Sequence, residues 1–137
     1  MRISNFLPCA GAVTAGLLVA VACSLSVDLD QARICRTALP ALEGGATRLE
    51  VGRVEHGREP NTVRIEYRAT QPGGAARSHH VVCRFAPVAP SAGRPDLVGI
   101  TTDRFSVSPA ALYLLKRYYL ETADAAANDP GRGHGAD

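Results

Sequence analysis

The side chains best suited to chemistry in this chain are four cysteines and one adjacent pair of histidines. Cys35 and Cys83 lie 48 residues apart in the polar part of the chain. If that part is exported, two thiols in one small domain are most simply explained by a disulfide. The alternative is two independent buried thiols, because free cysteine is often just part of a core. A metal site is less favoured, since zinc needs three or four ligands and no Cys-x-x-Cys motif occurs, so we expect no metal and no cofactor.

The two histidines, His79 and His80, are neighbours on an expected strand, so their side chains should point to opposite faces. His79 would share a face with Cys83, but a nucleophilic pair of the two needs a free thiolate, which a disulfide removes. The sequence has no Gly-x-Ser-x-Gly, His-Glu-x-x-His, phosphate-binding or calcium-binding loop. We therefore expect a non-enzymatic protein. The alternative is a periplasmic small-ligand-binding or enzymatic domain that uses the sheet face near these histidines.

Arginines and glutamates alternate along the first expected strands. Such interleaved charges usually keep a solvated sheet face soluble, although arginine also suits the recognition of carboxylates and phosphates. With 15 Lys+Arg against 13 Asp+Glu, 5% aromatic residues and no Trp, the composition argues against nucleic-acid binding. The residues concerned are Arg48, Glu50, Arg53, Glu55, Arg64, Glu66 and Arg68.

An uncharged segment occupies residues 6–27, with Arg2 before it and Asp28 and Asp30 after it. A helix of this length could cross a bilayer core of roughly 30 Å, and the segment also meets the criteria for a signal peptide. Both interpretations place residues 28–137 on the extracytoplasmic side of the membrane. We therefore predict a protein of the cell envelope, either anchored in the membrane or periplasmic.

The end of this segment, Ala20-Val21-Ala22-Cys23, resembles the lipobox of bacterial lipoproteins, although that motif usually has Leu at the position of Ala20. The resemblance implies that Cys23 is lipidated and becomes the new N-terminus. Three outcomes stay open: a cleaved signal peptide, a lipoprotein signal, or a retained transmembrane anchor.

Beyond residue 27, the pattern of apolar residues predicts one helix followed by four strands. Asp28 or Asp30 caps a helix over 28–39 that ends at Pro40. Its apolar stripe would consist of Leu29, Ala32, Cys35 and Leu39. Alternation predicts strands over 47–55, 62–69 and 78–86, with a less regular fourth strand over 96–103. Cys35 on the helix stripe and Cys83 on the inner sheet face would then be placed to form a disulfide.

A second helix is predicted from Pro109 to about Ala126, with Ser108 as its cap. One side should pack on the sheet through Ala111, Leu112, Leu115, Tyr118, Tyr119 and Thr122. The other side carries Tyr113 and Leu120 beside two cations, Lys116 and Arg117. We interpret these four residues as a patch for a partner helix or a membrane surface, while single exposed apolar residues without a function are the alternative.

Together these patterns predict an α+β protein in three parts. Residues 1–27 form a signal peptide, lipoprotein signal or transmembrane anchor. Residues 28–126 form a small two-layer domain in the order helix, four mainly antiparallel strands, helix. Residues 127–137, rich in glycine and polar residues, form a disordered tail. We expect an envelope interaction or accessory subunit that is held at the membrane by residues 6–27 and binds a protein partner, but not nucleic acid.

Overall fold

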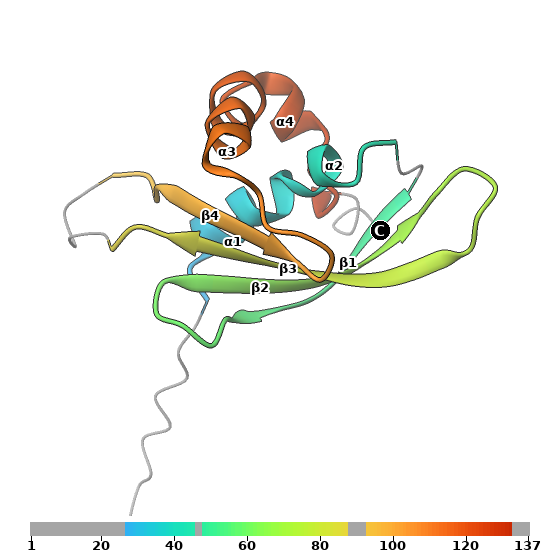
Figure 1. Cartoon of the computed structure of the whole chain (residues 1–137), viewed down its shortest axis with the longest axis horizontal. Coiled ribbons are helices and arrows are strands. Elements are labelled where there is room, and N and C mark those ends of the chain that lie inside the picture. The colour runs from blue at the N-terminus through green and yellow to red at the C-terminus, as the bar shows by residue number, and fades with distance from the viewer. Residues whose placement is uncertain (1–26, 46–47, 88–92, 133–137) are drawn as a thin grey trace, which may run out of the picture.

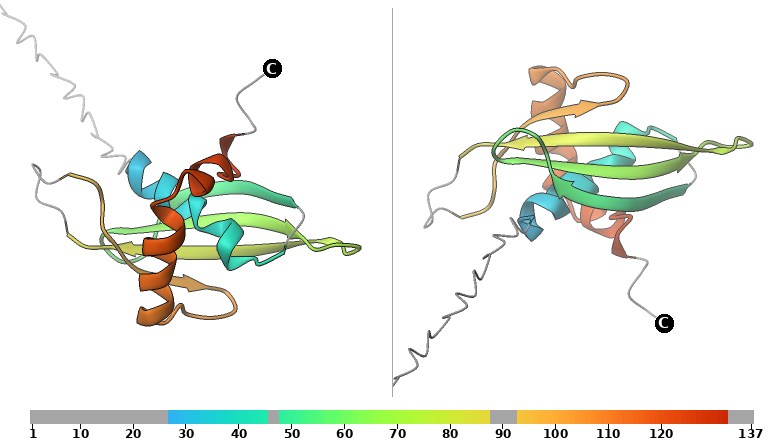
Figure 2. Two further views of the ribbon diagram at one scale, coloured as in Figure 1. Left: turned by 90° about the horizontal axis from the view of Figure 1, so that it is seen from above. Right: turned by 90° about the horizontal axis from the view of Figure 1, so that it is seen from below.

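The computed structural model of the chain describes residues 27–45, 48–87 and 93–132, and the expected signal or anchor segment lies outside these ranges. Four antiparallel strands form one sheet in the order β1-β2-β3-β4. The helices cover one face of this sheet and leave the other face bare (Figures 1 and 2). The predicted α+β class with four antiparallel strands is therefore confirmed. The strands are β1 (Arg48–His56), β2 (Thr62–Thr70), β3 (Ala76–Phe85) and β4 (Leu97–Thr102).

The first helix, α1 (Leu29–Thr37), begins where predicted because the Asp28 carboxylate accepts hydrogen bonds from two backbone amides of the first turn, each at 2.9 Å. Two details of the prediction were wrong. Leu29 is 84% exposed and does not join the buried stripe. Pro40 does not end this helix but lies in the first turn of a second short helix, α2 (Leu39–Leu42), where its missing N–H leaves no bond unmade.

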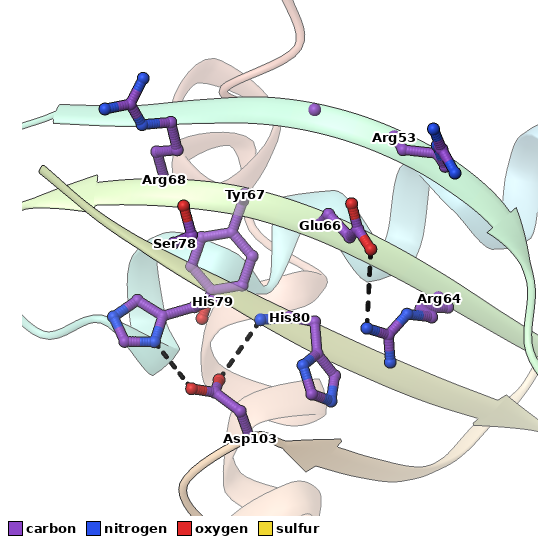
Figure 3. Close-up of a pocket in the computed structure, with 10 residues that line it drawn as sticks. Arg53, Arg64, Glu66, Tyr67, Arg68, Ser78, His79, His80 and Asp103 are labelled. Atoms are coloured by element: carbon purple, nitrogen blue, oxygen red, sulfur yellow. Dashed lines mark hydrogen bonds and ion pairs between the residues drawn. The ribbon is translucent and has the colours of Figure 1, made fainter.

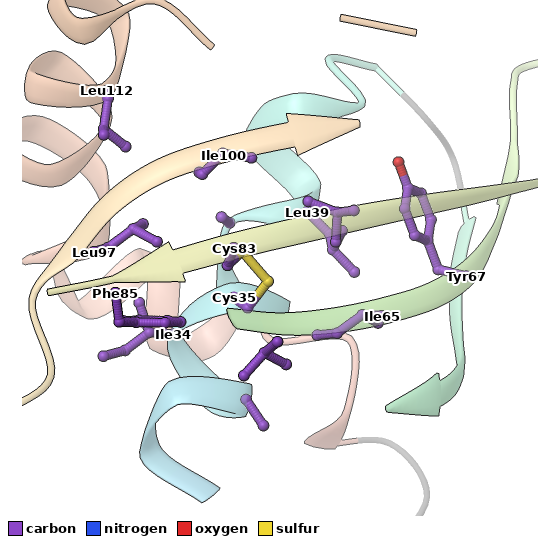
Figure 4. Close-up of a cluster of buried hydrophobic side chains, with 14 of the residues drawn as sticks. Ile34, Cys35, Leu39, Ile65, Tyr67, Cys83, Phe85, Leu97, Ile100 and Leu112 are labelled. Atoms are coloured by element: carbon purple, nitrogen blue, oxygen red, sulfur yellow. A yellow bond between two sulfur atoms is a disulfide. The ribbon is translucent and has the colours of Figure 1, made fainter. Parts of the chain in front are cut away.

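Alternation along the two central strands gives the sheet one apolar and one polar face. Val63, Ile65 and Tyr67 on β2 are buried, as predicted for that strand. On β3 the buried residues are Val81, Cys83 and Phe85, again as predicted. These side chains pack against α1 and enclose the disulfide (Figure 4).

The edge strand β1 contains a bulge that interrupts its alternation. Val51 pairs with Tyr67 and Val54 pairs with Ile65, so two residues of β1 face only one residue of β2. Gly52 is one of the two, and a β-carbon there would lie 3.1 Å from a backbone carbonyl oxygen of β2. The bulge returns Val54 to the core side, where it packs against the buried cluster.

The predicted single helix over 109–126 is in fact three segments, α3 (Pro109–Leu115), the π-helical η1 (Lys116–Leu120) and α4 (Ala123–Ala127). Ser108 caps the first segment as predicted. The helix breaks because Thr122 adopts an extended backbone, donates its hydroxyl proton to the Tyr119 carbonyl oxygen at 2.7 Å and caps α4. The π-helical turn also rotates the residues that follow it, by on the order of 100° for one extra residue.

The chain stays ordered beyond the end predicted for the domain, since residues 128–132 follow α4 and pack against α1. Asp129 is 8% exposed and receives two hydrogen bonds from the Arg36 guanidinium, at 2.5 and 2.7 Å. This bidentate ion pair explains why these residues are not part of a disordered tail. Residues 133–137, for which disorder was also predicted, lie outside the described ranges.

Candidate functional site

The predicted disulfide between Cys35 and Cys83 is present and joins α1 to β3 across the core, with a Cα–Cα distance of 5.8 Å (Figure 4). Both residues are completely buried. The covalent link occupies the thiol of Cys83, so the nucleophilic pair with His79 that the sequence raised as an option is not formed. The role of these cysteines in the structure is to hold helix to sheet.

The two histidines lie on opposite sides of β3, as predicted, and only His79 has a side-chain partner among the described residues. His79 pairs with Tyr67 across the strands, and their rings lie 5.8 Å apart. Its Nδ1 lies 2.9 Å from a carboxylate oxygen of Asp103, in the turn after β4 (Figure 3). Partial burial raises the pKa of Asp103, but the hydrogen bonds from His79 and from the His80 amide outweigh it and hold that pKa below its usual value.

A buried glutamate contacts Tyr67, the ring neighbour of His79, and was not singled out from the sequence. Glu43, in the turn after α2, is 4% exposed and accepts a hydrogen bond from the Tyr67 hydroxyl at 2.5 Å. Its carboxylate also pairs with the Arg104 guanidinium. Burial, together with the hydrogen bond to Glu43, raises the pKa of Tyr67 well above its ordinary value. The Glu43 carboxylate thus has two partners, Tyr67 and Arg104. Its pair with Arg104 links the turn after β4 to the turn after α2.

The sequence did hint at the contact between Glu43, Tyr67 and Arg104, because Tyr67 was expected on the inner sheet face. A buried tyrosine hydroxyl usually finds a hydrogen-bond partner, so a polar group near the end of β2 could have been anticipated. Its identity could not, since Glu43 and Arg104 come from two turns 61 residues apart that only the fold brings together. Across the described residues, no group of three or more His, Cys, Asp or Glu side chains is placed to hold a metal ion.

A shallow groove of about 470 Å³ lies over the sheet at β1, β2 and β3, beside the Asp103 turn (Figure 3). Glu66 lines it, and its carboxylate lies 3.6 Å from the Arg64 guanidinium. Arg53 and Arg68 also line it, and neither has a carboxylate within ion-pair distance in the described parts of the chain. The full lining consists of Gly52, Arg53, Arg64, Glu66, Tyr67, Arg68, Ser78, His79, His80 and Asp103.

The predicted patch on the C-terminal helix is divided by the π-helical turn. Tyr113 is 63% exposed, as expected, but Leu120 turns inward and packs against the buried cluster. Lys116 binds Asp96 and the Leu97 carbonyl oxygen, so its ammonium group is engaged within the protein. Arg117 is exposed and lies 3.3 Å from Glu121.

A different set of exposed apolar residues takes the place of the predicted patch. Tyr118, expected to face the sheet, is 70% exposed, and Leu114 is 54% exposed. Leu114 and Tyr118 are four residues apart, and Tyr113 and Tyr118 are five apart, which are the spacings of neighbours across an α-helical and a π-helical turn. We call Tyr113, Leu114 and Tyr118 the aromatic surface of α3 and η1.

The remaining predicted site, Cys23, and the apolar segment 6–27 lie outside the described residues. In the described ranges, no helix combines the length and the apolar character that a membrane crossing requires. Lipidation of Cys23 and anchoring by residues 6–27 therefore stay predictions from the sequence.

Compared with known family models, with curated proteins and with solved structures, the chain has no significant match in any of the three.

Proposed function

We propose that the protein is a non-enzymatic interaction or accessory subunit of the cell envelope that binds a protein partner through the aromatic surface of α3 and η1. The observation that carries this proposal is the exposure of three large apolar side chains, Tyr113, Leu114 and Tyr118, at neighbouring positions on one helical segment. Aromatic residues are enriched at protein interfaces because they bury a large area at a small cost in side-chain entropy. π-helical turns are rare, and they occur frequently at functional sites.

A protein partner is better supported than a lipid surface as the occupant of the aromatic surface. Helices that lie on membranes combine an apolar face with lysines and arginines that are free to reach anionic headgroups. Here Lys116 is bound to Asp96, and Arg117 lies beside Glu121. With both nearby cations paired with carboxylates of this chain, apolar contact remains as the main source of affinity.

The disulfide supports the proposed location outside the cytoplasm. Disulfides persist in oxidising compartments and are rare in the cytosol, where thiols are kept reduced. Cys35 and Cys83 are fully buried and covalently joined, so they are a permanent part of this core. In the proposal, residues 6–27 carry the domain across the membrane and hold it there.

A non-enzymatic role is supported by the way the reactive side chains are used. Cys83 is in the disulfide, His79 is held by Asp103, and the buried carboxylate of Glu43 is satisfied by Tyr67 and Arg104. Each of these groups ties one segment of the fold to another. We therefore assign them a structural role and the aromatic surface the binding role.

The test is to place a photo-crosslinking amino acid at Tyr118 in the full chain, in the cells that produce it, and to identify the adduct by mass spectrometry. We expect one predominant protein adduct from this position and none from the same amino acid at Arg77, an exposed position on β3. The substitution Tyr118→Ser should abolish co-purification of that protein from membranes. Leu29→Ser is the matched control, because Leu29 is also a large exposed apolar residue, but on α1.

Two results would contradict the proposal. One is the absence of any protein adduct at Tyr118 and Tyr113. The other is an equal loss of the partner in the Leu29→Ser variant. Thermal unfolding of each variant excludes loss of fold as the cause, since substitutions at exposed positions normally change stability by about 0.5 kcal/mol or less.

A further inference from the structure

The bare face of the sheet carries more arginine than its glutamates can pair with. In the antiparallel register, Glu50 lies opposite Arg68, Glu55 opposite Arg64, and Glu66 opposite His80. The ion pairs follow a different pattern, however. The guanidinium of Arg48 lies 2.9 Å from the carboxylate of Glu50. The guanidinium of Arg64 lies 3.6 Å from the carboxylates of both Glu55 and Glu66. Two arginines therefore engage all three glutamates of this face.

Arg84, Arg53 and Arg68 of this face are left over, and Arg53 and Arg68 line the groove described above. In the ranges that the structure describes, no carboxylate is within ion-pair distance of either guanidinium. Figure 3 shows the link between Arg64 and Glu66, while Arg53 and Arg68 make no marked interaction. The bulge in β1 contributes to this arrangement, because it inserts Arg53 opposite Glu66 and so beside the groove.

The groove also offers hydrogen-bond donors other than its arginines. Ser78 pairs with Arg68, and His80 pairs with Glu66 across β2 and β3, and both line the groove. A hydroxyl and an imidazole can each donate a hydrogen bond to an oxyanion. Glu66 shares Arg64 with Glu55, so its negative charge is only partly offset. The three arginines that line the groove nevertheless outnumber its two carboxylates, Glu66 and Asp103.

From this arrangement we propose that the groove binds a small molecule through an oxyanion, a phosphate or a carboxylate, with Arg53 and Arg68 as the principal contacts. Guanidinium groups bind both anions through paired N–H donors, which is why arginine predominates at such sites. The volume of about 470 Å³ suits a small organic molecule. This inference goes beyond the proposed function, since the groove lies on the bare face of the sheet and the aromatic surface on the helices.

The test is a titration of the full chain, in an uncharged detergent, with inorganic phosphate and separately with succinate, at constant ionic strength set by sodium chloride. Binding is followed by the NMR shifts of the backbone amides of Gly52, Ser78 and His80. We expect a saturable shift with at least one of the two anions. Arg53→Gln and Arg68→Gln should each weaken binding by about tenfold, the loss typical of one hydrogen-bonded charged contact.

Arg84→Gln is the matched control. Arg84 lies on the same bare face and carries the same charge, but its guanidinium packs over Gly99 on the β4 side and it does not line the groove. We expect this variant to bind within about twofold of the natural chain, since removal of a distant surface charge has a small and screened effect. The inference is overturned if neither anion gives a saturable shift. It is also overturned if Arg84→Gln weakens binding as much as Arg53→Gln, because the anion would then respond only to net charge.

Discussion

The disulfide should supply a large share of the stability of this domain, and the effect can be calculated from its position. Cys35 and Cys83 close a loop of 48 residues. The chain-entropy estimate for a loop of that length is about 4 kcal/mol at 25 °C, because the link removes extended conformations from the unfolded chain. Domains of this size are stable by only about 5–15 kcal/mol. Replacing both cysteines by alanine should therefore leave a marginally stable protein, with a melting temperature lower by on the order of 20 °C.

The assay is chemical denaturation of the full chain, comparing the natural protein with the double variant Cys35→Ala, Cys83→Ala. Alanine is the suitable replacement, since both positions are completely buried and a serine hydroxyl would need a partner there. Cys23→Ala is the control and should leave the free energy of unfolding unchanged. The reasoning is refuted if the double variant loses less than about 1 kcal/mol, at the low end of measured disulfide effects. Alkylation of both thiols in the folded natural protein would refute it as well.

Three further predictions follow from single contacts: two concern buried hydrogen bonds, and one concerns a glycine that leaves no room for a side chain. Asp129→Asn should lower the free energy of unfolding by about 2 kcal/mol at pH 7, because Arg36 loses its charged partner. Burial raises the pKa of Asp129, but the Arg36 guanidinium outweighs burial and holds that pKa below its usual value. The stabilisation is therefore present above about pH 4 and is lost as the pH falls through the lowered pKa, so the difference in stability between natural protein and variant should shrink as the pH falls below 4. Tyr67→Phe should cost about 1–2 kcal/mol, since buried Glu43 keeps only one partner. Because the pKa of Tyr67 is raised, the natural protein should lose stability above about pH 10, and the phenylalanine variant should lose less. Gly57→Ala should cost about 1–3 kcal/mol in thermal unfolding, as a β-carbon there would lie 2.1 Å from a threonine hydroxyl oxygen, and an unchanged melting temperature would contradict this.

Much of the fold could be predicted from local patterns. Alternating apolar residues predicted β2 and β3 with the correct inner faces, because a strand with one buried face must alternate. Asp28 and Ser108 marked the starts of α1 and α3, because a side-chain oxygen at that position satisfies backbone amides of the first turn. The disulfide followed from two such assignments, since a helix stripe and an inner sheet face have to meet in a two-layer domain.

The C-terminal segment shows where local patterns fail. The buried face expected from the sequence included Tyr118 and left Leu120 outside, whereas in the structure Leu120 packs against the buried cluster and Tyr118 is exposed. Thr122 followed by Asp124 does resemble the start of a new helix, so the break at α4 left a trace in the sequence. The π-helical turn left no such trace, because no capping residue or change of hydrophobic period marks its start at Lys116.

The candidate sites divide in the same way. Residue order alone determined that arginine and glutamate would share the outer face of the sheet, that His79 and His80 would point apart, and that Cys35 and Cys83 would face the core. Only the tertiary structure decided which arginines form ion pairs with the glutamates, because these pairs depend on the reach of the side chains across strands and on the bulge at Gly52. The same holds for Glu43, Asp103 and Asp129. Each lies in a turn or terminal segment with no periodicity of its own, and each meets a partner far away in the sequence that only the folded chain brings near.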